Sequence, residues 1–156
     1  MAIDVSKLQE WTYHGLPFNA QLIELDKKSP NFIQGFVYII THVPSGKAYI
    51  GKKNFVKPHS KKVNGKKKKS LIESDWKTYC GSSEYLLIDI EKFGIENFSR
   101  EILHLCAMKG IMSYHETNEI FCRGALTLPD KFWNEWVSCR IRRSHLKSII
   151  VAPPVK

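Results

Sequence analysis

The stretch that decides the fold is GFVYIITHVPSGKAYIGKK, residues 35–53 of the chain. Its first half, residues 35–43, is apolar and β-branched, which is typical of a strand. The sequence PSGK at 44–47 combines turn-forming residues, and residues 47–53 predict a second strand. Two strands joined by so short a turn pair as an antiparallel hairpin. We therefore expect a β-hairpin here.

A helix is predicted further along the chain, over GSSEYLLIDIEKFG at residues 81–94. Ser82 or Ser83 would cap its N-terminus. Gly94 would end it, because glycine readily adopts the left-handed conformation that closes a helix. One face of this helix carries apolar residues at helical spacing. These residues are Leu86, Leu87, Ile90 and Phe93.

Three further segments complete the predicted elements. Residues 97–106 predict a third strand from a broken alternation of apolar side chains, and residues 113–123 predict a second helix. Residues 130–147 follow a turn and are expected to be helical in part. The order of two strands, a helix, a strand and two helices predicts an α/β (α+β) fold. Its core would be a small three-stranded antiparallel sheet flanked by helices.

The length of 156 residues predicts one domain. We place this domain at residues 35–147, after an N-terminal extension over 1–34 and before a tail over 148–156. Within the extension, Ser6 is expected to cap a short helix.

The composition is that of an ordinary globular protein, with 43% hydrophobic and 25% charged residues. No apolar run approaches the ~18 residues of a membrane span, and the N-terminus lacks the pattern of a signal peptide. No two cysteines have the C-x-x-C spacing of a zinc ribbon. We therefore expect a cytoplasmic protein with no membrane partner and with reduced thiols. The thiols belong to Cys80, Cys106, Cys122 and Cys139.

The positive charge is concentrated in one segment. The net charge is +9, and nine lysines without any acidic residue lie between Lys52 and Lys69. Outside that stretch, basic and acidic residues balance at 15 each. Such a block favours a polyanionic partner, although a solvated loop would carry the same charges. Interrupting Pro, Ser, Asn and Gly residues argue against a membrane-surface helix and predict a loop over 52–75.

Two tyrosines of the predicted hairpin, Tyr38 and Tyr49, are 11 positions apart. That separation can bring both phenols to one face of the sheet. Such a pair suits phosphodiester hydrolysis, because one phenol with its pKa lowered by nearby cations could take a proton from the attacking water. The lysines after Tyr49 would stabilise the added negative charge on phosphorus. From the two tyrosines alone, the favoured interpretation is that both are ordinary half-buried strand residues.

The same residues carry a resemblance to a known family. Tyr38 and the sequence Tyr49-Ile50-Gly51 resemble the signature of the GIY-YIG nucleases. Phe36-Val37-Tyr38 stands where that family has Gly-Ile-Tyr, so the first element is degenerate. The resemblance extends over residues 36–147 and is greatest to phage homing endonucleases of the Seg type. A phage-encoded member would act in the cytoplasm of its host cell.

Three further segments support the resemblance. Residues 81–103 are similar to the segment that joins the first helix of the Seg-type domain to its third strand. Residues 114–120 resemble the family helix that carries a metal-binding glutamate, with Glu116 in the ligand position. Phe132-Trp133-Asn134 resembles the aromatic-asparagine element near the end of the domain.

The resemblance implies a metal-dependent DNA endonuclease that hydrolyses phosphodiester bonds of double-stranded DNA at a site of two catalytic tyrosines and one glutamate. Glu116 would hold one Mg²⁺, or another divalent cation such as Mn²⁺. From the residues alone, Ser113 and Glu116 could instead form a capping box at the start of the helix. Glu119, one turn further, is the fallback ligand, and its alternative role is an ion pair with Arg123.

One departure from the family concerns arginine. The family usually has an arginine on its first helix, but no arginine precedes Arg100 here. Three cations could act at the scissile phosphate instead: Lys77 as the first candidate, Lys52 as the second and His59 as the third. By family likeness Asn134 would support the site or contact phosphate, and a turn amide is its alternative role.

The basic run at 140–147, like the lysine block, contains no acidic residue and could lie along a DNA backbone. The nucleic-acid contacts that we expect are Lys53, Lys57, Lys61, Lys62, Lys66, Lys67, Lys68, Lys69, Arg140, Arg142 and Arg143. Phe132, Trp133 and Trp136 are expected in the core. The competing functions are a non-catalytic nucleic-acid-binding protein on the same fold and, ranked last, an RNA-binding protein.

Overall fold

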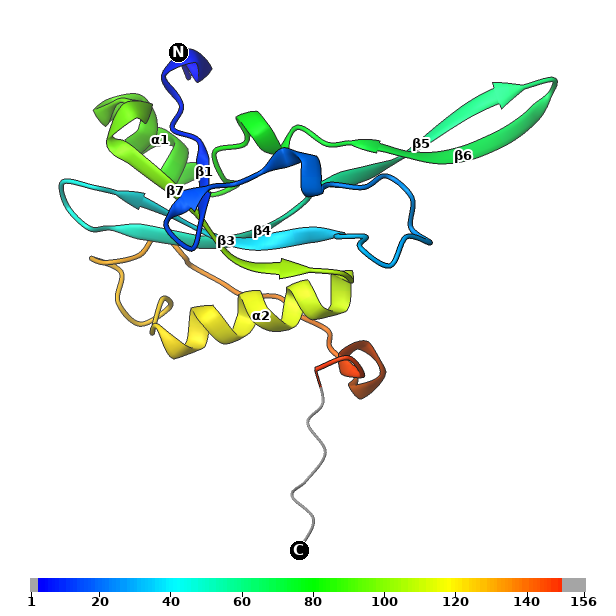
Figure 1. Ribbon diagram of the computed structural model, residues 1–156. Helices are drawn as coiled ribbons and strands as arrows, with labels where there is room; N and C mark the ends of the chain where they lie inside the picture. Colours follow the sequence, from blue (N-terminus) through cyan, green and yellow to red (C-terminus); the bar gives the residue numbers. More distant parts are fainter. Residues whose placement is uncertain (1–2, 150–156) are drawn as a thin grey trace, which may run out of the picture.

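The computed structural model describes residues 3–149, which form one mixed sheet with a helix on each face and a long projecting hairpin (Figure 1). The sheet has five strands in the order β2-β1-β7-β3-β4. These are β1 (Trp11–Tyr13), β2 (Leu16–Pro17), β3 (Gly35–His42), β4 (Ala48–Asn54) and β7 (Phe98–Cys106). No helix within residues 3–149 is long and apolar enough to cross a membrane.

The prediction of a plain three-stranded antiparallel sheet is wrong. Strands β3, β4 and β7 do pair antiparallel, as expected. However, β1 adds to β7 in parallel, and β2 pairs antiparallel with β1. The segment expected to be an N-terminal extension therefore contributes two strands to the same sheet. With three and two residues, these strands are too short to show an alternating pattern in the sequence.

The central hairpin of β3 and β4 confirms the prediction from residues 35–53. Its register pairs Tyr38 with Gly51 and Ile40 with Tyr49. Because alternate residues of a strand point to the same face, the two tyrosines lie on one face of the sheet. The third strand, predicted over 97–106, is also confirmed as β7.

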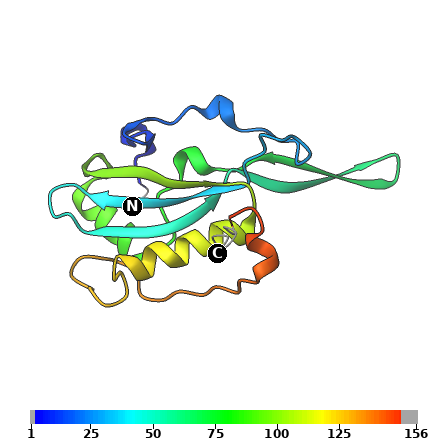
Figure 2. The same ribbon diagram turned by 60° about the horizontal axis from the view of Figure 1, so that its bottom comes forward.

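The two helices cover opposite faces of the sheet (Figure 1), and Figure 2 shows α2 from the side that it covers. Helix α1 (Glu84–Phe93) packs through Leu86 and Ile90 in the same cluster as Tyr38. Helix α2 (Lys109–Cys122) covers the other face. The buried cluster of the α2 face consists of Val37, Ile50, Cys106, Ile111, Met112, Ile120 and Ala125.

Helix α1 is capped as predicted. The hydroxyl of Ser83 accepts a hydrogen bond from the backbone N–H of Leu86 at 3.4 Å, and Gly94 follows the helix with a φ of 87°. Helix α2 begins earlier than its predicted start at residue 113. Its N-cap residue, Met108, makes no side-chain capping hydrogen bond, so the sequence carries no start signal at that point.

The lysine-rich segment predicted as a loop over 52–75 continues β4 and then forms a second hairpin, of β5 (Val56–Val63) and β6 (Lys66–Glu73). Asn64 and Gly65 form its turn with φ values of 48° and 73°. Two successive positive φ angles are what a type I′ hairpin turn requires, and Asn-Gly is its usual sequence. Residues 60–70 are exposed on both faces, so no apolar alternation reveals these strands.

The segment at 130–147 is predicted to be helical in part, but its only helix is the 3₁₀ turn Arg143–Leu146. Backbone hydrogen bonds hold the segment extended along the outer edge of β4. The N–H of Ala48 donates to the carbonyl of Lys131 at 2.9 Å, and the N–H of Trp133 donates to the carbonyl of Ala48 at 3.0 Å. These bonds replace the hydrogen bonds that a helix would have made.

Short elements occur near both termini. The 3₁₀ turn Val5–Lys7 is capped by Asp4 and not by Ser6 as predicted, because the carboxylate of Asp4 accepts from the N–H of Ser6 at 3.1 Å. The predicted tail over 148–156 lies, from residue 150 onward, outside the described residues. The remaining 3₁₀ turns are Ala20–Leu22, Trp76–Thr78 and Ile95–Asn97.

A buried guanidinium joins three segments that are distant in sequence. Arg100, on β7, is 3% exposed. It donates to the carbonyl of Gln9 at 2.8 and 2.5 Å, to that of Lys77 at 3.0 Å and to that of Tyr79 at 2.9 Å. It also lies 4.6 Å from the ring centroid of Trp11. Burial lowers the pKa of Arg100 to about 10, which leaves the guanidinium charged at neutral pH.

We predict that Arg100→Met lowers the free energy of unfolding by about 2–4 kcal/mol, because three backbone carbonyls lose a charged donor that is itself buried. Urea denaturation followed by tryptophan fluorescence measures this change. Arg123→Met is the control, since Arg123 is exposed and pairs with Glu119 at the end of α2. The control should cost less than about 1 kcal/mol. Equal effects of the two changes would contradict the linking role of Arg100.

Candidate active site

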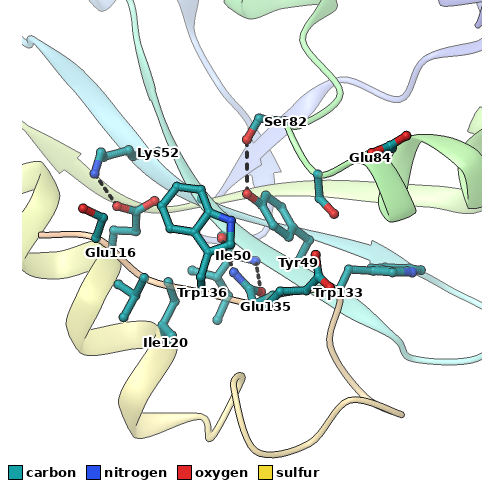
Figure 3. A pocket seen from close by; sticks show the side chains of 15 residues that line it. Tyr49, Ile50, Lys52, Ser82, Glu84, Glu116, Ile120, Trp133, Glu135 and Trp136 are labelled. Atoms are coloured by element: carbon teal, nitrogen blue, oxygen red, sulfur yellow. Dashed lines mark hydrogen bonds and ion pairs between the residues drawn. The ribbon is translucent and has the colours of Figure 1, made fainter.

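A cleft of about 490 Å³ lies along the outer edge of β4 (Figure 3). Because β4 is the edge strand of the sheet, side chains from both faces reach this cleft. One wall comes from β4 and the residues before α1, and the other comes from α2 and the segment after residue 132. The polar and aromatic residues that line it include Tyr49, Lys52, Ser82, Glu116, Asn134 and Trp136.

The two tyrosines lie side by side, as the hairpin predicted, but only Tyr49 lines the cleft. Their ring centroids are 6.3 Å apart. Tyr38 is fully buried, and its hydroxyl donates to that of Tyr79 at 3.4 Å. Tyr49 is half-buried, and its hydroxyl lies 3.1 Å from Oγ of Ser82 in the cleft wall.

Burial is the largest cause of a raised pKa in both phenols. The pKa of Tyr38 is raised further by the neighbouring Tyr79 and Tyr49, whereas the hydrogen bond with Ser82 acts to lower the pKa of Tyr49. The surroundings therefore do not produce the lowered pKa expected of a general base. At neutral pH both hydroxyls keep their protons and can donate hydrogen bonds.

The glycine of Tyr49-Ile50-Gly51 has a steric role. A Cβ on Gly51 would overlap the hydroxyl and ring of Tyr38, and it would lie 3.0 Å from the ring of Tyr49. Only a residue without a side chain leaves room for the Tyr38 ring to lie across β4 beside Tyr49. The motif therefore encodes a packing requirement between its first tyrosine and its glycine.

Glu116 and Lys52 meet in the cleft. Nζ of Lys52 lies 2.5 Å from Oε2 of Glu116, and the side chains are 32% and 15% exposed respectively. No described residue donates to the second carboxylate oxygen, Oε1. Both Ser113 and Glu116 lie inside α2, so the capping-box alternative for this glutamate is wrong.

The donor set at this position fits a hard divalent cation. Mg²⁺ keeps several waters and typically binds one or two carboxylates together with substrate phosphate oxygens. Glu116 offers one carboxylate with a free oxygen at the cleft. Among residues 3–149, no group of three or more His, Cys, Asp or Glu side chains forms a metal site made of protein alone. A cation at Glu116 would compete with Lys52 for the carboxylate.

Glu119, the fallback ligand, is engaged elsewhere and does not line the cleft. Its carboxylate accepts from Nε of Arg123 at 2.7 Å and lies 2.7 Å from Nε2 of His104. Burial acts to raise the pKa of Glu119, but these two hydrogen bonds outweigh burial and leave the pKa lowered. The geometry corresponds to the alternative role as an ion pair with Arg123.

Asn134 is buried and pairs with β4. Its Nδ2 donates to the carbonyl of Ile50 at 2.8 Å, and its Oδ1 accepts from the N–H of Ile50 at 3.0 Å. The amide thus completes the hydrogen bonding of the outer edge of β4, as an additional strand would. This geometry favours a positioning role in the cleft wall over a direct phosphate contact.

The other candidate cations lie away from the cleft. Nζ of Lys77 pairs with Glu73 at 3.0 Å at an exposed position. His59 lies on β5, within the projecting hairpin. Of the three candidates, Lys52 is the one that the fold brings next to Glu116.

Like charges face each other across the β5–β6 hairpin. Lys61 is opposite Lys68, and Lys62 is opposite Lys67. Because successive pairs point to opposite faces, both faces of this ribbon are basic. Directly opposed like charges destabilise a hairpin in isolation.

The exposed Arg140, Arg142 and Arg143 lie in the segment that returns beside α2 (Figure 2).

A second cavity, of about 210 Å³, lies at the base of the β5–β6 hairpin. Four lysines contribute to its lining: Lys27, Lys53, Lys57 and Lys109. Lys53 also forms an ion pair of 2.6 Å with Asp75. Lys27 and Lys109 were not among the expected contacts. They come from distant parts of the chain and lie outside the lysine block, so no local charge pattern points to them.

Residues 11–137 match the family model described as "Putative endonuclease segE, GIY-YIG domain". Searches of curated proteins and of solved structures gave no match. The family match covers most of the chain, so the protein belongs to this GIY-YIG endonuclease family. The matched range includes β1, the two tyrosines, Glu116 and Asn134.

We predict that Asn134→Ala lowers the free energy of unfolding by about 1–3 kcal/mol, because the Ile50 peptide loses both of its partners at the edge of β4. Urea denaturation measures this loss. Asn118→Ala is the matched control, since Asn118 is exposed on α2, and it should change stability by less than about 0.5 kcal/mol. Unchanged stability of Asn134→Ala would show that the amide is free for another role.

Proposed function

We propose that the protein is a metal-dependent DNA endonuclease that hydrolyses phosphodiester bonds in the cleft at the edge of β4. The observation that carries this proposal is the convergence of a carboxylate, an ammonium group and a phenol, from Glu116, Lys52 and Tyr49, in one cleft. Membership of the GIY-YIG endonuclease family and the net charge of +9 support a nucleic acid as the substrate.

Each of these groups has a role that follows from its chemistry. A divalent cation held by Glu116 would supply positive charge to the phosphate. Lys52, once displaced from Glu116, would place its ammonium on a phosphate oxygen, where negative charge increases in the transition state. The hydroxyl of Tyr49 would hold the attacking water. Because burial raises the pKa of this phenol, acceptance of the water proton by Tyr49 would require the positive charge of the bound cation to favour the deprotonated phenol. Tyr38 and Gly51 would fix the ring of Tyr49.

Double-stranded DNA is the proposed substrate, and the β5–β6 hairpin is its proposed main contact. A two-stranded ribbon fits the major groove, which is about 12 Å wide. Lysines on both faces of the ribbon would then reach phosphates on both walls of the groove. The lysine-lined cavity at the base of the hairpin and the three exposed arginines at 140–143 would extend this contact along the molecule.

We predict that Glu116→Gln abolishes nicking of supercoiled plasmid in Mg²⁺ while DNA binding is retained. The amide keeps the size of the side chain but loses the charge that a divalent cation requires. Nicking assays with Mg²⁺ and with EDTA, and mobility shifts for binding, measure these effects. Glu135→Gln is the matched control, because Glu135 also lines the cleft but is exposed, and it should retain activity.

Two outcomes would contradict this assignment. Wild-type protein that binds DNA but does not nick it in Mg²⁺ or Mn²⁺ would favour the alternative of a non-catalytic nucleic-acid-binding protein on the same fold. Full activity of Glu116→Gln would place the metal elsewhere, with Glu119 as the next residue to test.

We predict that Lys52→Gln lowers kcat by about 100-fold, since one positioned charge at the transition state typically contributes this much. Lys77→Gln should leave kcat near the wild-type value, because Lys77 pairs with Glu73 outside the cleft. Single-turnover plasmid nicking at saturating protein measures both variants. The reverse ranking would give Lys77 the role of the missing family arginine.

We predict that changing Lys66, Lys67, Lys68 and Lys69 to Gln flattens the log–log salt dependence of DNA binding by up to about 3.6, at ~0.9 per neutralised phosphate. Fluorescence anisotropy over a salt series measures the slope. The matched control makes the same charge change at exposed lysines elsewhere. These are Lys7, Lys28, Lys92 and Lys131. Equal slopes for the two quadruple variants would move the DNA contact away from the hairpin.

A further inference from the structure

Trp136 differs from the other three tryptophans of the chain. Trp11, Trp76 and Trp133 are 3–5% exposed, and each indole N–H donates a hydrogen bond of 2.8 or 2.9 Å. Trp136 was expected in the core, but its side chain is 73% exposed. Within the described residues its indole makes no hydrogen bond and no contact with another ring. The expectation for this residue is therefore wrong.

The exposure of Trp136 does not result from a detached segment. Two residues before it, Asn134 is fixed to Ile50 by two hydrogen bonds. The next residue, Val137, packs against the apolar cluster beneath α2. The backbone is thus held on both sides of Trp136, and a fully apolar indole face is left in water at a defined place. An indole held in this way beside a cleft presents a flat aromatic face that a ligand bound in the cleft can cover.

The place is the cleft of the proposed active site. Trp136 lines this cleft together with Tyr49, Lys52 and Glu116 (Figure 3). In that view the indole lies between the Lys52–Glu116 pair and the ring of Tyr49. A group that contacts the indole would therefore be attached to, or adjacent to, a phosphate that lies at Glu116 and Lys52. In a nucleic acid, the flat apolar group next to a phosphate is a base.

We propose that Trp136 is a stacking platform for the base of a nucleotide beside the scissile phosphate, an inference that rests on the proposed function. Within a duplex the faces of each base are covered by its neighbours, so stacking on Trp136 requires a base that has left the stack. The cleft would consequently select DNA that is locally unpaired, such as DNA with a bulged base. Stacking on an aromatic side chain is sequence-tolerant, so the preference would concern base pairing and not base identity.

The test is a binding experiment without divalent cations, so that no cleavage occurs. The probes are three fluorescent duplexes of one sequence: fully paired, with one bulged adenine, and with a bulged abasic site in place of that adenine. Wild-type protein should bind the bulged adenine more tightly than either other probe. Trp136→Ala should lose this preference, with a loss of affinity for the bulged adenine of about 5- to 100-fold, the usual contribution of one base–aromatic stack.

Three control variants separate stacking from other effects. Trp136→Phe should keep most of the preference, whereas Trp136→Leu, which is apolar but not aromatic, should lose it. Phe121→Ala removes an aromatic side chain that is 62% exposed on α2 outside the cleft, and it should bind all three probes as the wild type does. Circular dichroism and thermal midpoints check that each variant is folded.

An unchanged preference in Trp136→Ala, or equal binding of the adenine and abasic bulges by wild type, would overturn the stacking role. Either result is independent of whether the protein nicks plasmid, so the nicking assay tests the proposed nuclease activity separately. Conversely, a wild-type preference that depends on Trp136 would support the stacking role even if the site proved inactive in Mg²⁺.

Discussion

The buried guanidinium of Arg100 is the constraint on which one face of the molecule depends. Its hydrogen bonds to the carbonyls of Gln9, Lys77 and Tyr79 attach the N-terminal segment and the segment before α1 to the central strand β7. The hydroxyl of Tyr79, which is held in this way, accepts a hydrogen bond from the hydroxyl of the buried Tyr38. A single side chain thereby fixes the layer against which the first tyrosine of the motif packs, although it lies outside the cleft itself.

The cleft owes its composition to the position of β4 at the edge of the sheet. Tyr49 and Lys52 project from opposite faces of this strand, and only at an edge can both reach one cleft. On the α2 face, Lys52 is already engaged by Glu116. Cation binding and phosphate binding would therefore be coupled through one ion pair, because a cation that takes the carboxylate frees the ammonium for the substrate. The ion pair holds both groups in place until then.

The sequence predicted the parts of the fold whose residues alternate or repeat regularly. The hairpin of residues 35–53, helix α1 with its Ser83 cap, and strand β7 all follow apolar patterns and were found as expected. Strand β1 was missed because three residues are too few to show an alternation of apolar and polar side chains. Its pairing also depends on a parallel partner, β7, far along the chain. The β5–β6 hairpin was missed because its exposed strands lack an apolar face, although Asn64-Gly65 signalled its turn.

At the candidate site, the motif predicted that the tyrosines would be neighbours, but it could not show which of them faces the cleft. The proximity of Lys52 to Glu116 depends on how α2 crosses the sheet, which no local pattern records. The positions of Lys27, Lys109 and Trp136 likewise depend on tertiary packing that no local pattern records. Each gains its surroundings from segments that meet only in the folded chain.

The link between Gln9 and Arg100 spans 91 positions of the chain, and it has a consequence for the order of folding. During synthesis both hairpins can form from neighbouring residues as they emerge, since closing a short loop is fast. Strand β1 cannot pair at that stage, because its parallel partner β7 leaves the ribosome much later. Contacts over such a separation raise the entropic cost of closure and slow the final step. We expect the N-terminal segment to dock last, on a sheet that is otherwise already assembled.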